Sequence, residues 1–248
     1  MKGFFSALKL LSVIPIKANG EYKNIAFYFG FVGALIGLIC GLLIFVGQRL
    51  WGNIVAGALG VTGDLILTGA LHFDGLSDIA DSFLGAKTRE KRIEILKDPH
   101  VGAFGLGVGV SMIIMRFGLL SSLKWNFLEV LVLVLIYALS RSLAAIVLCA
   151  FAPANFSSIA SWAVAKNSKM CIFLNCLVVV ITALIYAFFV PGAMPLVRAS
   201  LFVLIPVVLS GFLVLIAKKL VSGINGDLLG AIIYLSEIAT LGVVAVKW

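Results

Sequence analysis

The amino-acid sequence predicts an all-α, polytopic integral membrane protein: a bundle of about seven transmembrane helices with an N-terminal interfacial helix and short cytoplasmic helices. Of its 248 residues, 62% are hydrophobic and only 12% are charged. The mean hydropathy is +1.17, and several apolar runs reach the ~18 residues that a helix needs to cross a bilayer. The runs lack the alternating pattern of outer-membrane strands, so we expect helices, which satisfy their own backbone hydrogen bonds in hydrocarbon.

The opening MKGFFSALKLLSVIPIK predicts the interfacial helix. The apolar residues of one helical face are Phe4, Phe5, Leu8 and Leu11. The lysines Lys2, Lys9 and Lys17 would meet headgroups or water. Lys9 interrupts the apolar run and no small-residue cleavage pattern follows, so we do not expect a signal peptide.

The candidate spans follow in order along the chain, at 25–46, 52–72, 102–122, 127–150, 170–190, 198–217 and 228–246. No duplicated half or long linker separates them, so residues 1–248 are predicted to form a single membrane domain. Gly33, Gly37 and Gly41 repeat every four residues in the first span, which predicts a flat stripe for close packing against another helix.

Lys and Arg are distributed unequally between the two sides of these spans. With a cytoplasmic N-terminus, most of the 19 basic residues lie inside, and the outside carries only Arg49, Lys124, Arg198 and Lys247. The bias predicts a protein of the cytoplasmic membrane with its N-terminus and its acidic segments on the cytoplasmic side.

Three aspartates and a histidine gather in TGALHFDGLSDIADSF, Thr68 to Phe83. If this segment is helical, Asp74, Asp78 and Asp81 stand at i, i+4 and i+7 and share an arc of roughly 60°. Their mutual repulsion near a bilayer would be relieved by a divalent cation, and hard oxygen ligands suit Mg²⁺ or Mn²⁺. The pattern indicates phosphoryl transfer; the alternative is a solvated helix face.

The segment KTREKRIEILKDPHVGAFG follows directly. One interpretation is a surface helix laced with ion pairs; the other assigns Arg92 and Lys97 to substrate phosphates and Asp98 to a metal or a hydroxyl. His72 and His100 form no zinc-binding spacing. His72 is a candidate general base or a hydrogen-bonding interface residue.

Near the C-terminal end, SGINGDLLGAIIYLSE brings in Asp227 and Glu237. Asp227 is either a further ligand at a helix N-terminus or only the helix N-cap. Asp64, Arg116 and Arg141 lie within predicted spans, where they either form structural ion pairs or face a wet cavity.

The composition also argues against other classes of protein. The net charge of +8 comes from scattered residues without a long basic tract, so we expect no nucleic-acid partner. The four cysteines form no CxxC pair, which gives little support to thiolate metal sites or disulfides. Membrane lipid is the expected environment, and a homo-oligomer is left open.

The sequence resembles the cobalamin synthase family, the membrane adenosylcobinamide-GDP ribazoletransferases. The resemblance is carried by LTGALHFDGLSDIADSFLG, KRIEILKDPHVGAFG and GINGDLLGAIIYLSE, with support from ALKLLSVIP, FYFGFVGALIGLI and LSRSLAAIVL, and covers nearly the whole chain in order. It implies a transferase of late cobalamin biosynthesis that joins adenosylcobinamide-GDP to α-ribazole or its 5′-phosphate, with Mg²⁺, and releases GMP.

The matched motifs also imply residue roles. The metal ligands would be Asp74, Asp78, Asp81 and Asp227; the catalytic residues Asp81, Asp98, Arg92 and His72; and the substrate-binding residues Lys97, Arg141, Gly102, Gly105 and Asn225. The chain departs from the family pattern at Ser82, at Pro99-His100 and at Asn225. The acid spacing also loosely resembles the CDP-alcohol phosphotransferases, and an ion or corrinoid transporter using Asp64, Arg116 and Arg141 is a further alternative.

Overall fold

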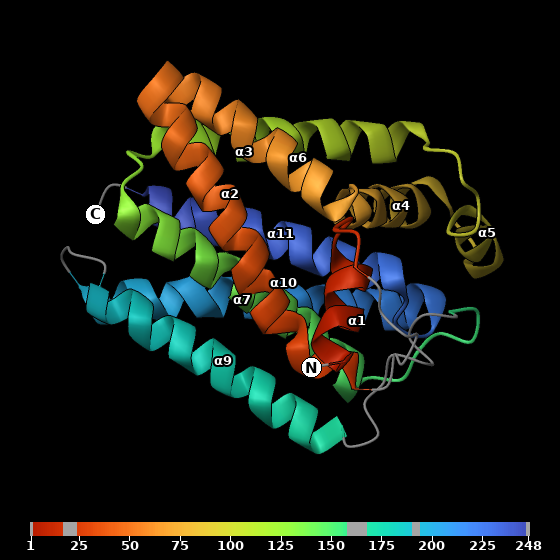
Figure 1. Ribbon diagram of the computed structural model, residues 1–248. Coiled ribbons are helices and arrows are strands. Elements are labelled where there is room, and N and C mark those ends of the chain that lie inside the picture. The colour runs from red at the N-terminus through yellow and green to blue at the C-terminus, as the bar shows by residue number, and fades with distance from the viewer. Residues whose placement is uncertain (1, 17–23, 158–167, 190–193, 247–248) are drawn as a thin grey trace.

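The computed structural model describes residues 2–16, 24–157, 168–189 and 194–246 (Figure 1). Their helices are α1 (Lys2–Leu11), η1 (Ile25–Tyr28, a 3-10 turn), α2 (Phe29–Trp51), α3 (Asn53–Thr68), α4 (Leu71–Gly85), α5 (Arg89–Ile95), α6 (Ala103–Ser122), α7 (Phe127–Ala150), α9 (Ser168–Phe189), α10 (Pro195–Val221) and α11 (Gly226–Ala245). Within these residues the only β-type pairing is an isolated bridge between Pro153 and Ile224. The prediction of an all-α protein is confirmed.

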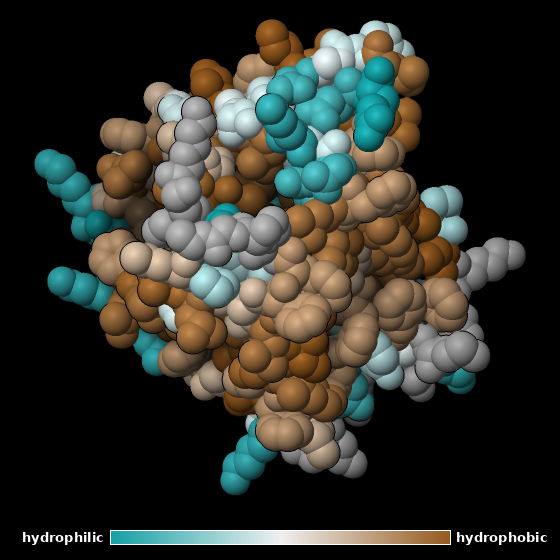
Figure 2. Space-filling model, turned by 90° about the vertical axis from the view of Figure 1, so that its left-hand side faces the viewer, coloured by the Kyte–Doolittle hydropathy of each residue, from teal (hydrophilic) through white to brown (hydrophobic). Residues whose placement is uncertain are grey.

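Six helices are long and apolar enough to cross a membrane: Ile25–Trp51, Ala103–Ser122, Phe127–Ala150, Ser168–Phe189, Pro195–Val221 and Gly226–Ala245. The bent pair α3 and α4 adds a seventh candidate if the two form one span. Large apolar side chains such as Phe188 and Leu196 lie on the surface, and Figure 2 shows a largely hydrophobic face with separate hydrophilic patches. This surface suits lipid as solvent, so the protein is a multi-pass membrane protein.

The ends of the helices sort to two sides of the bundle. In Figure 1 the C end and the turns that join α2 to α3 and α6 to α7 lie on the left. The short helix α5 and the chain that follows α7 lie on the right. The acidic segments therefore share one end of the bundle, as predicted from the sequence, although the structure itself does not say which compartment that end faces.

The predicted second span, 52–72, ends earlier than expected. Helix α3 has 16 residues and stops at Thr68, which gives it a length of about 24 Å, short of a hydrocarbon core of about 30 Å. Gly69 and Ala70 then adopt left-handed backbone angles (φ 62° and 57°), and α4 leaves at 89° to α3. His72 consequently belongs to α4, together with the aspartates.

The glycine stripe of α2 packs against α7, as its spacing predicts. A Cβ atom on Gly37 would lie 2.9 Å from the carbonyl oxygen of Leu133, and one on Gly41 would lie 3.1 Å from Cγ1 of Val130. Neither contact leaves room for a larger side chain without movement, because the backbone of α2 lies directly against backbone and side-chain atoms of α7 along the stripe.

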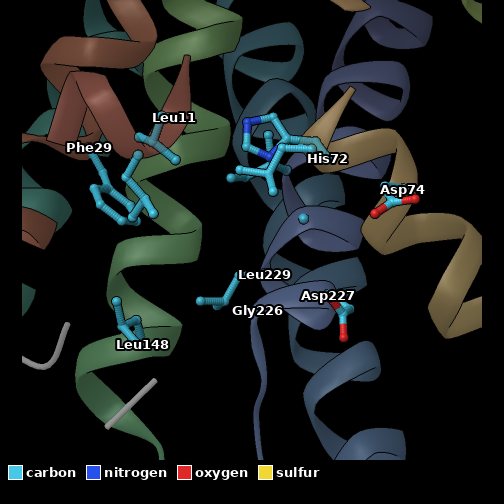
Figure 3. A pocket seen from close by; sticks show the side chains of 12 residues that line it. Leu11, Phe29, His72, Asp74, Leu148, Gly226, Asp227 and Leu229 are labelled. Atoms are coloured by element: carbon cyan, nitrogen blue, oxygen red, sulfur yellow. The ribbon is translucent and has the colours of Figure 1, made fainter. Parts of the chain in front are cut away.

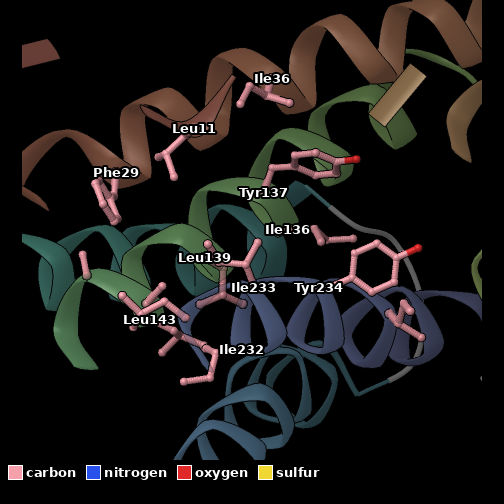
Figure 4. Close-up of a cluster of buried hydrophobic side chains, with 14 of the residues drawn as sticks. Leu11, Phe29, Ile36, Ile136, Tyr137, Leu139, Leu143, Ile232, Ile233 and Tyr234 are labelled. Atoms are coloured by element: carbon pink, nitrogen blue, oxygen red, sulfur yellow. The ribbon is translucent and has the colours of Figure 1, made fainter. Parts of the chain in front are cut away.

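A continuous hydrophobic core joins α1, α2, α7 and α11. Leu11 of α1 and Ile36 of α2 are buried, as are Tyr137 of α7 and Ile233 of α11, and Figure 4 shows these side chains facing one another between the helices. Helix α1 forms where the amphipathic opening predicts it and buries Leu8 and Leu11. Its location at the membrane interface stays a prediction.

Four ionisable side chains meet inside the bundle and form a buried charge cluster: Asp64 of α3, Arg116 of α6, Arg141 of α7 and Glu237 of α11. Arg116 Nη1 lies 3.1 Å from Asp64 Oδ2 and 2.9 Å from Glu237 Oε2. Arg141 pairs with the other Glu237 oxygen. The two acids balance the two arginines, which is how buried charges are tolerated in a membrane interior.

Candidate functional site

The aspartate segment forms α4, the helix that its spacing predicts. Along α4, exposure falls in chain order, since Asp74 is exposed, Asp78 is half-buried and Asp81 is buried. The shared arc that the sequence suggested is therefore divided between two environments: the first two aspartates stay accessible, whereas the third points into the protein.

Helix α4 packs against the first turn of α11, which brings Asp227 to the aspartates. A Cβ atom on Gly75 would lie 2.7 Å from the backbone carbonyl oxygen of Asp227, so only glycine permits this approach. The charge of Asp74 acts on both Asp78 and Asp227, and the charge of Asp227 acts on Asp78. We call Asp74, Asp78 and Asp227 the acid cluster.

Asn225 fixes the start of α11 and orients Asp227. Its Oδ1 accepts a hydrogen bond from the Leu228 amide at 3.1 Å, and its Nδ2 donates to Asp227 Oδ2 at 2.7 Å. The N-cap is therefore Asn225, not Asp227 as one interpretation held. Asn225 is 3% exposed and positions Asp227 in this structure; the substrate contact predicted for it stays a prediction.

Asp81 binds the start of α6, although its charge also acts on Asp78. Its Oδ2 accepts a hydrogen bond from the Gly102 amide at 2.7 Å and its Oδ1 accepts one from the Gly105 amide at 2.8 Å. A carboxylate at a helix N-terminus is stabilised by these amides and by the helix dipole. The amides of Gly102 and Gly105, predicted to bind substrate, are thus engaged by Asp81, and we leave Asp81 out of the metal-ligand set.

The basic segment after α4 forms the surface helix that one interpretation predicted. Helix α5 has no buried residue, and Lys91 pairs with Glu94 at 2.8 Å. The backbone carbonyl of Arg92 accepts a hydrogen bond from the Ser82 hydroxyl at 3.1 Å, which ties α5 to the C-terminal end of α4. Lys97 follows α5 and is exposed.

Asp98 lies apart from the acid cluster, in the connection between α5 and α6. Its Oδ1 accepts a hydrogen bond from the backbone amide of His100 at 3.0 Å. The same oxygen lies 2.7 Å from Nδ1 of the His100 ring. The side-chain hydrogen bond from His100, followed by the backbone one, lowers the pKa of Asp98. The structure therefore gives Asp98 a local partner, His100, and its catalytic role stays a prediction.

His72 is a buried residue of α4 and lies just before Asp74, the first aspartate of that helix. It is 3% exposed, and its Nε2 has no hydrogen-bond partner among the described residues. Asp74, Asp227 and His72 line the same cavity, and Figure 3 shows the imidazole on the α4 side of that cavity.

Arg141 occupies a different place from the one that the sequence motif implied. Its side chain is completely buried and its guanidinium lies 4.4 Å from the ring centroid of Tyr137. Because it pairs with Glu237 deep between α7 and α11, Arg141 is not available to a substrate at the acid cluster. The sequence identified Asp64, Arg116 and Arg141 as ionisable residues in spans but gave no sign that Glu237 pairs with both arginines.

The acid cluster has the oxygen ligands that a cation site needs, but its side chains are not arranged to enclose an ion. In the described part of the chain, no group of three or more His, Cys, Asp or Glu side chains is arranged to hold a metal ion. Among the same residues, no Lys or Arg forms an ion pair with Asp74, Asp78 or Asp227. One exposed and two half-buried carboxylates thus lie within electrostatic reach of one another without a described basic partner.

The profile of the cobalamin-5-phosphate synthase family matches residues 3–245, from α1 to the end of α11. The chain belongs to the cobalamin-5-phosphate synthase family. This assignment confirms the resemblance that the acidic motifs indicated, and the match includes every residue of the acid cluster.

Several members of the family are similar to the chain and are named adenosylcobinamide-GDP ribazoletransferase. The protein from Treponema denticola is 31% identical over 257 residues, covering 97% of this chain and 96% of that protein. The protein from Prosthecochloris aestuarii is 32% identical, covering 93% and 92% of the two chains. A relative from Shewanella denitrificans is 41% identical, but the match spans about half of each protein (49% and 46%). No solved structure is significantly similar to the chain.

Proposed function

We propose that this protein is an adenosylcobinamide-GDP ribazoletransferase that catalyses a late step of cobalamin biosynthesis. The observation that carries the proposal is the family match over residues 3–245, together with two relatives of that name that align over more than nine-tenths of this chain. Family membership also favours this reaction over the CDP-alcohol phosphotransferase and transporter alternatives.

In the proposed reaction a ribazole hydroxyl attacks the phosphorus linked to cobinamide in adenosylcobinamide-GDP. A new bond forms between that oxygen and phosphorus, and the diphosphate bond to GMP breaks. GMP departs with the electron pair of the broken bond, and the hydroxyl proton is lost to a base. The product is adenosylcobalamin, or its phosphate when the acceptor is α-ribazole 5′-phosphate.

The acid cluster fits a divalent cation, and we assign Asp74, Asp78 and Asp227 as its ligands. All three are hard oxygen donors outside any described ion pair, and each acts electrostatically on another member of the cluster. When bound, Mg²⁺ or Mn²⁺ would neutralise charge on the diphosphate. Asn225 would hold Asp227 in place through its amide hydrogen bond.

The residues around the acid cluster supply the remaining roles. Arg92 and Lys97, on and after α5, stay our predicted contacts for phosphate oxygens because α5 is tied to the end of α4. Asp98 stays a predicted proton carrier, since its carboxylate is exposed and is bonded to His100. We place this end of the bundle on the cytoplasmic side, where the bias of Lys and Arg puts it.

Release of GMP tests the proposal directly. The purified full chain in nanodiscs would be given adenosylcobinamide-GDP and either α-ribazole or its 5′-phosphate, and GMP would be measured over a range of Mg²⁺ and Mn²⁺ concentrations. We expect release that requires both substrates and the cation. A folded protein that releases no GMP under any of these conditions refutes the proposal.

The same preparation separates the two alternatives. A CDP-alcohol phosphotransferase would release CMP from a CDP-linked lipid, and a transporter would move ions or corrinoid into tight proteoliposomes in a manner dependent on Asp64. We expect neither activity.

A further inference from the structure

An apolar cavity of about 90 Å³ opens beside the acid cluster, between α1, α2, α4, α7 and α11. Its apolar wall consists of buried or partly buried side chains that already face one another in this structure: Leu10, Leu11, Phe29, Leu148, Leu229 and Ile233. The volume is several times the roughly 10–15 Å³ that one water needs by such a measure. A largely apolar pocket with a few polar groups is typical of a small-molecule site.

His72 provides one of those polar groups. Its imidazole extends from α4 toward Leu11 across the cavity (Figure 3), and its Nε2 has no hydrogen-bond partner in the described part of the chain. Leaving a buried polar nitrogen unpaired costs roughly 1–3 kcal/mol. A ligand that offers one hydrogen-bonding atom at this place would recover that energy.

Asp74 and Asp227 provide the other polar groups, at the rim of the cavity. Both line it (Figure 3), and both belong to the acid cluster. A ligand that fills the apolar part would thus carry its polar end to the residues that we assign to the cation.

The site therefore suits a planar, mostly apolar heteroaromatic base that has one free ring nitrogen and is joined to a sugar. Guanine fits poorly, because its several polar edge groups would meet the apolar wall, where His72 Nε2 is the polar atom, while Asp74 and Asp227 lie at the rim. A corrinoid ring is far too large, and a lipid chain would leave His72 Nε2 unpaired. Among the substrates of the proposed function, on which this inference rests, the dimethylated benzimidazole of α-ribazole has the required chemistry.

We propose that this cavity binds the benzimidazole of α-ribazole, with His72 Nε2 bonded to the free ring nitrogen and the ribose directed to Asp74 and Asp227. His72 then recognises the acceptor substrate instead of serving as the general base that the sequence suggested. The assignment explains why the side chain of His72, on a helix that carries three aspartates, points toward an apolar wall.

Two free bases that differ in a single ring atom test the contact without any turnover. 5,6-Dimethylbenzimidazole has the ring nitrogen, and 5,6-dimethylindole has a CH group in its place. Binding of each would be measured by calorimetry on the full chain in nanodiscs, with no corrinoid present. We expect the wild-type protein to prefer the benzimidazole about tenfold, the factor that one lost hydrogen bond of about 1.4 kcal/mol produces.

Three variants complete the test. His72→Phe keeps bulk but removes the hydrogen-bonding nitrogen, so it should bind the two bases equally. Leu148→Phe should fill the cavity and weaken both bases, whereas Leu215→Phe, at a site in α10 that is 67% exposed, should change neither. In turnover, His72→Phe should raise the KM for ribazole about tenfold and leave kcat and the corrinoid KM near wild type.

The outcomes separate this inference from the proposed function. Equal binding of the two bases by the wild-type protein, binding of neither base, or a preference that survives in His72→Phe overturns the inference, even if GMP is released normally. A loss of kcat in His72→Phe with an unchanged ribazole KM also overturns it. Absence of GMP release refutes the proposed function, while the comparison of the two bases still decides whether the cavity is a benzimidazole site.

Discussion

Asp78 and Asp81 illustrate how the same residue type on one helix acquires two roles. Asp78 is half-buried and lies under the influence of Asp74 and Asp227. Asp81, less than one turn further on, accepts two amide hydrogen bonds from the start of α6. The difference follows from what each carboxylate faces: other carboxylates in one case, and the positive end of a helix in the other.

Replacing Asp78 with Asn should abolish cation-dependent GMP release while leaving the folded protein at least as stable. Removing one negative charge relieves repulsion within the acid cluster but also removes a proposed ligand. Thermal unfolding in detergent and the GMP assay would be measured on the same preparation. Wild-type turnover in Asp78→Asn would contradict its assignment as a ligand.

Replacing Asp81 with Ala should lower stability, in contrast to Asp78→Asn. The variant loses both acceptors at the start of α6, and loss of such a cap costs about 1–2 kcal/mol. Thermal unfolding measures the effect. An unchanged melting temperature together with lost cation affinity would return Asp81 to the ligand set.

At the scale of elements, the site depends on the approach of α4 to α11. These helices are far apart in the sequence, yet Gly75 contacts the backbone of Asp227 and His72 packs beside Gly230. The bridge between Pro153 and Ile224, with its 2.8 Å hydrogen bond from the Ala154 amide to the Ile224 oxygen, holds the chain just before α11. The acid cluster is thus assembled by helix packing.

Gly75→Ala should separate α4 from α11 and impair the acid cluster. Its added Cβ would lie 2.7 Å from the Asp227 oxygen, whereas a Cβ on Gly118 of α6 would have no atom within 4 Å. We therefore expect Gly75→Ala to weaken Mg²⁺ activation of GMP release at least tenfold, about 1.4 kcal/mol, and Gly118→Ala to behave as wild type. Equal activation curves for the two variants would show that the close approach is unnecessary.

The buried charge cluster joins α3, α6, α7 and α11, and breaking it should be costly. Glu237→Gln leaves Arg116 and Arg141 with Asp64 alone, and an uncompensated buried charge costs about 3–5 kcal/mol. Glu94→Gln, on the exposed pair with Lys91, is the matched control and should have little effect. A Glu237→Gln protein that melts at the wild-type temperature would show that the cluster does not stabilise the bundle.

On the scale of the whole molecule, the acid cluster and α5 lie at the end of the bundle opposite the C end (Figure 1). If the six long helices and the shorter α3 each cross the membrane, the chain comes back to this end before each acidic segment. Such an arrangement lets a large soluble substrate reach the site from one compartment, while exposed apolar side chains along the helices, such as Leu184 and Leu215, would face lipid.

Cysteine labelling tests the orientation. Lys97→Cys, after α5, and Lys124→Cys, between α6 and α7, place accessible thiols at opposite ends of the bundle. In sealed, right-side-out cells, a membrane-impermeant maleimide should label Lys124→Cys but label Lys97→Cys only after lysis. The reverse pattern would place the acid cluster outside the cell.

The sequence by itself determined the fold class, most of the spans, the helix that carries the aspartates and the family. These features depend on local hydrophobicity, on periodicity and on motifs whose residues are close along the chain. The tertiary structure alone decided that α3 stops at Thr68, that Asp81 and Asn225 bind backbone and side-chain partners within the protein, and that Arg141 pairs with Glu237. Those outcomes depend on which helices pack together, and periodicity along one helix carries no information about the neighbour that its side chains will meet.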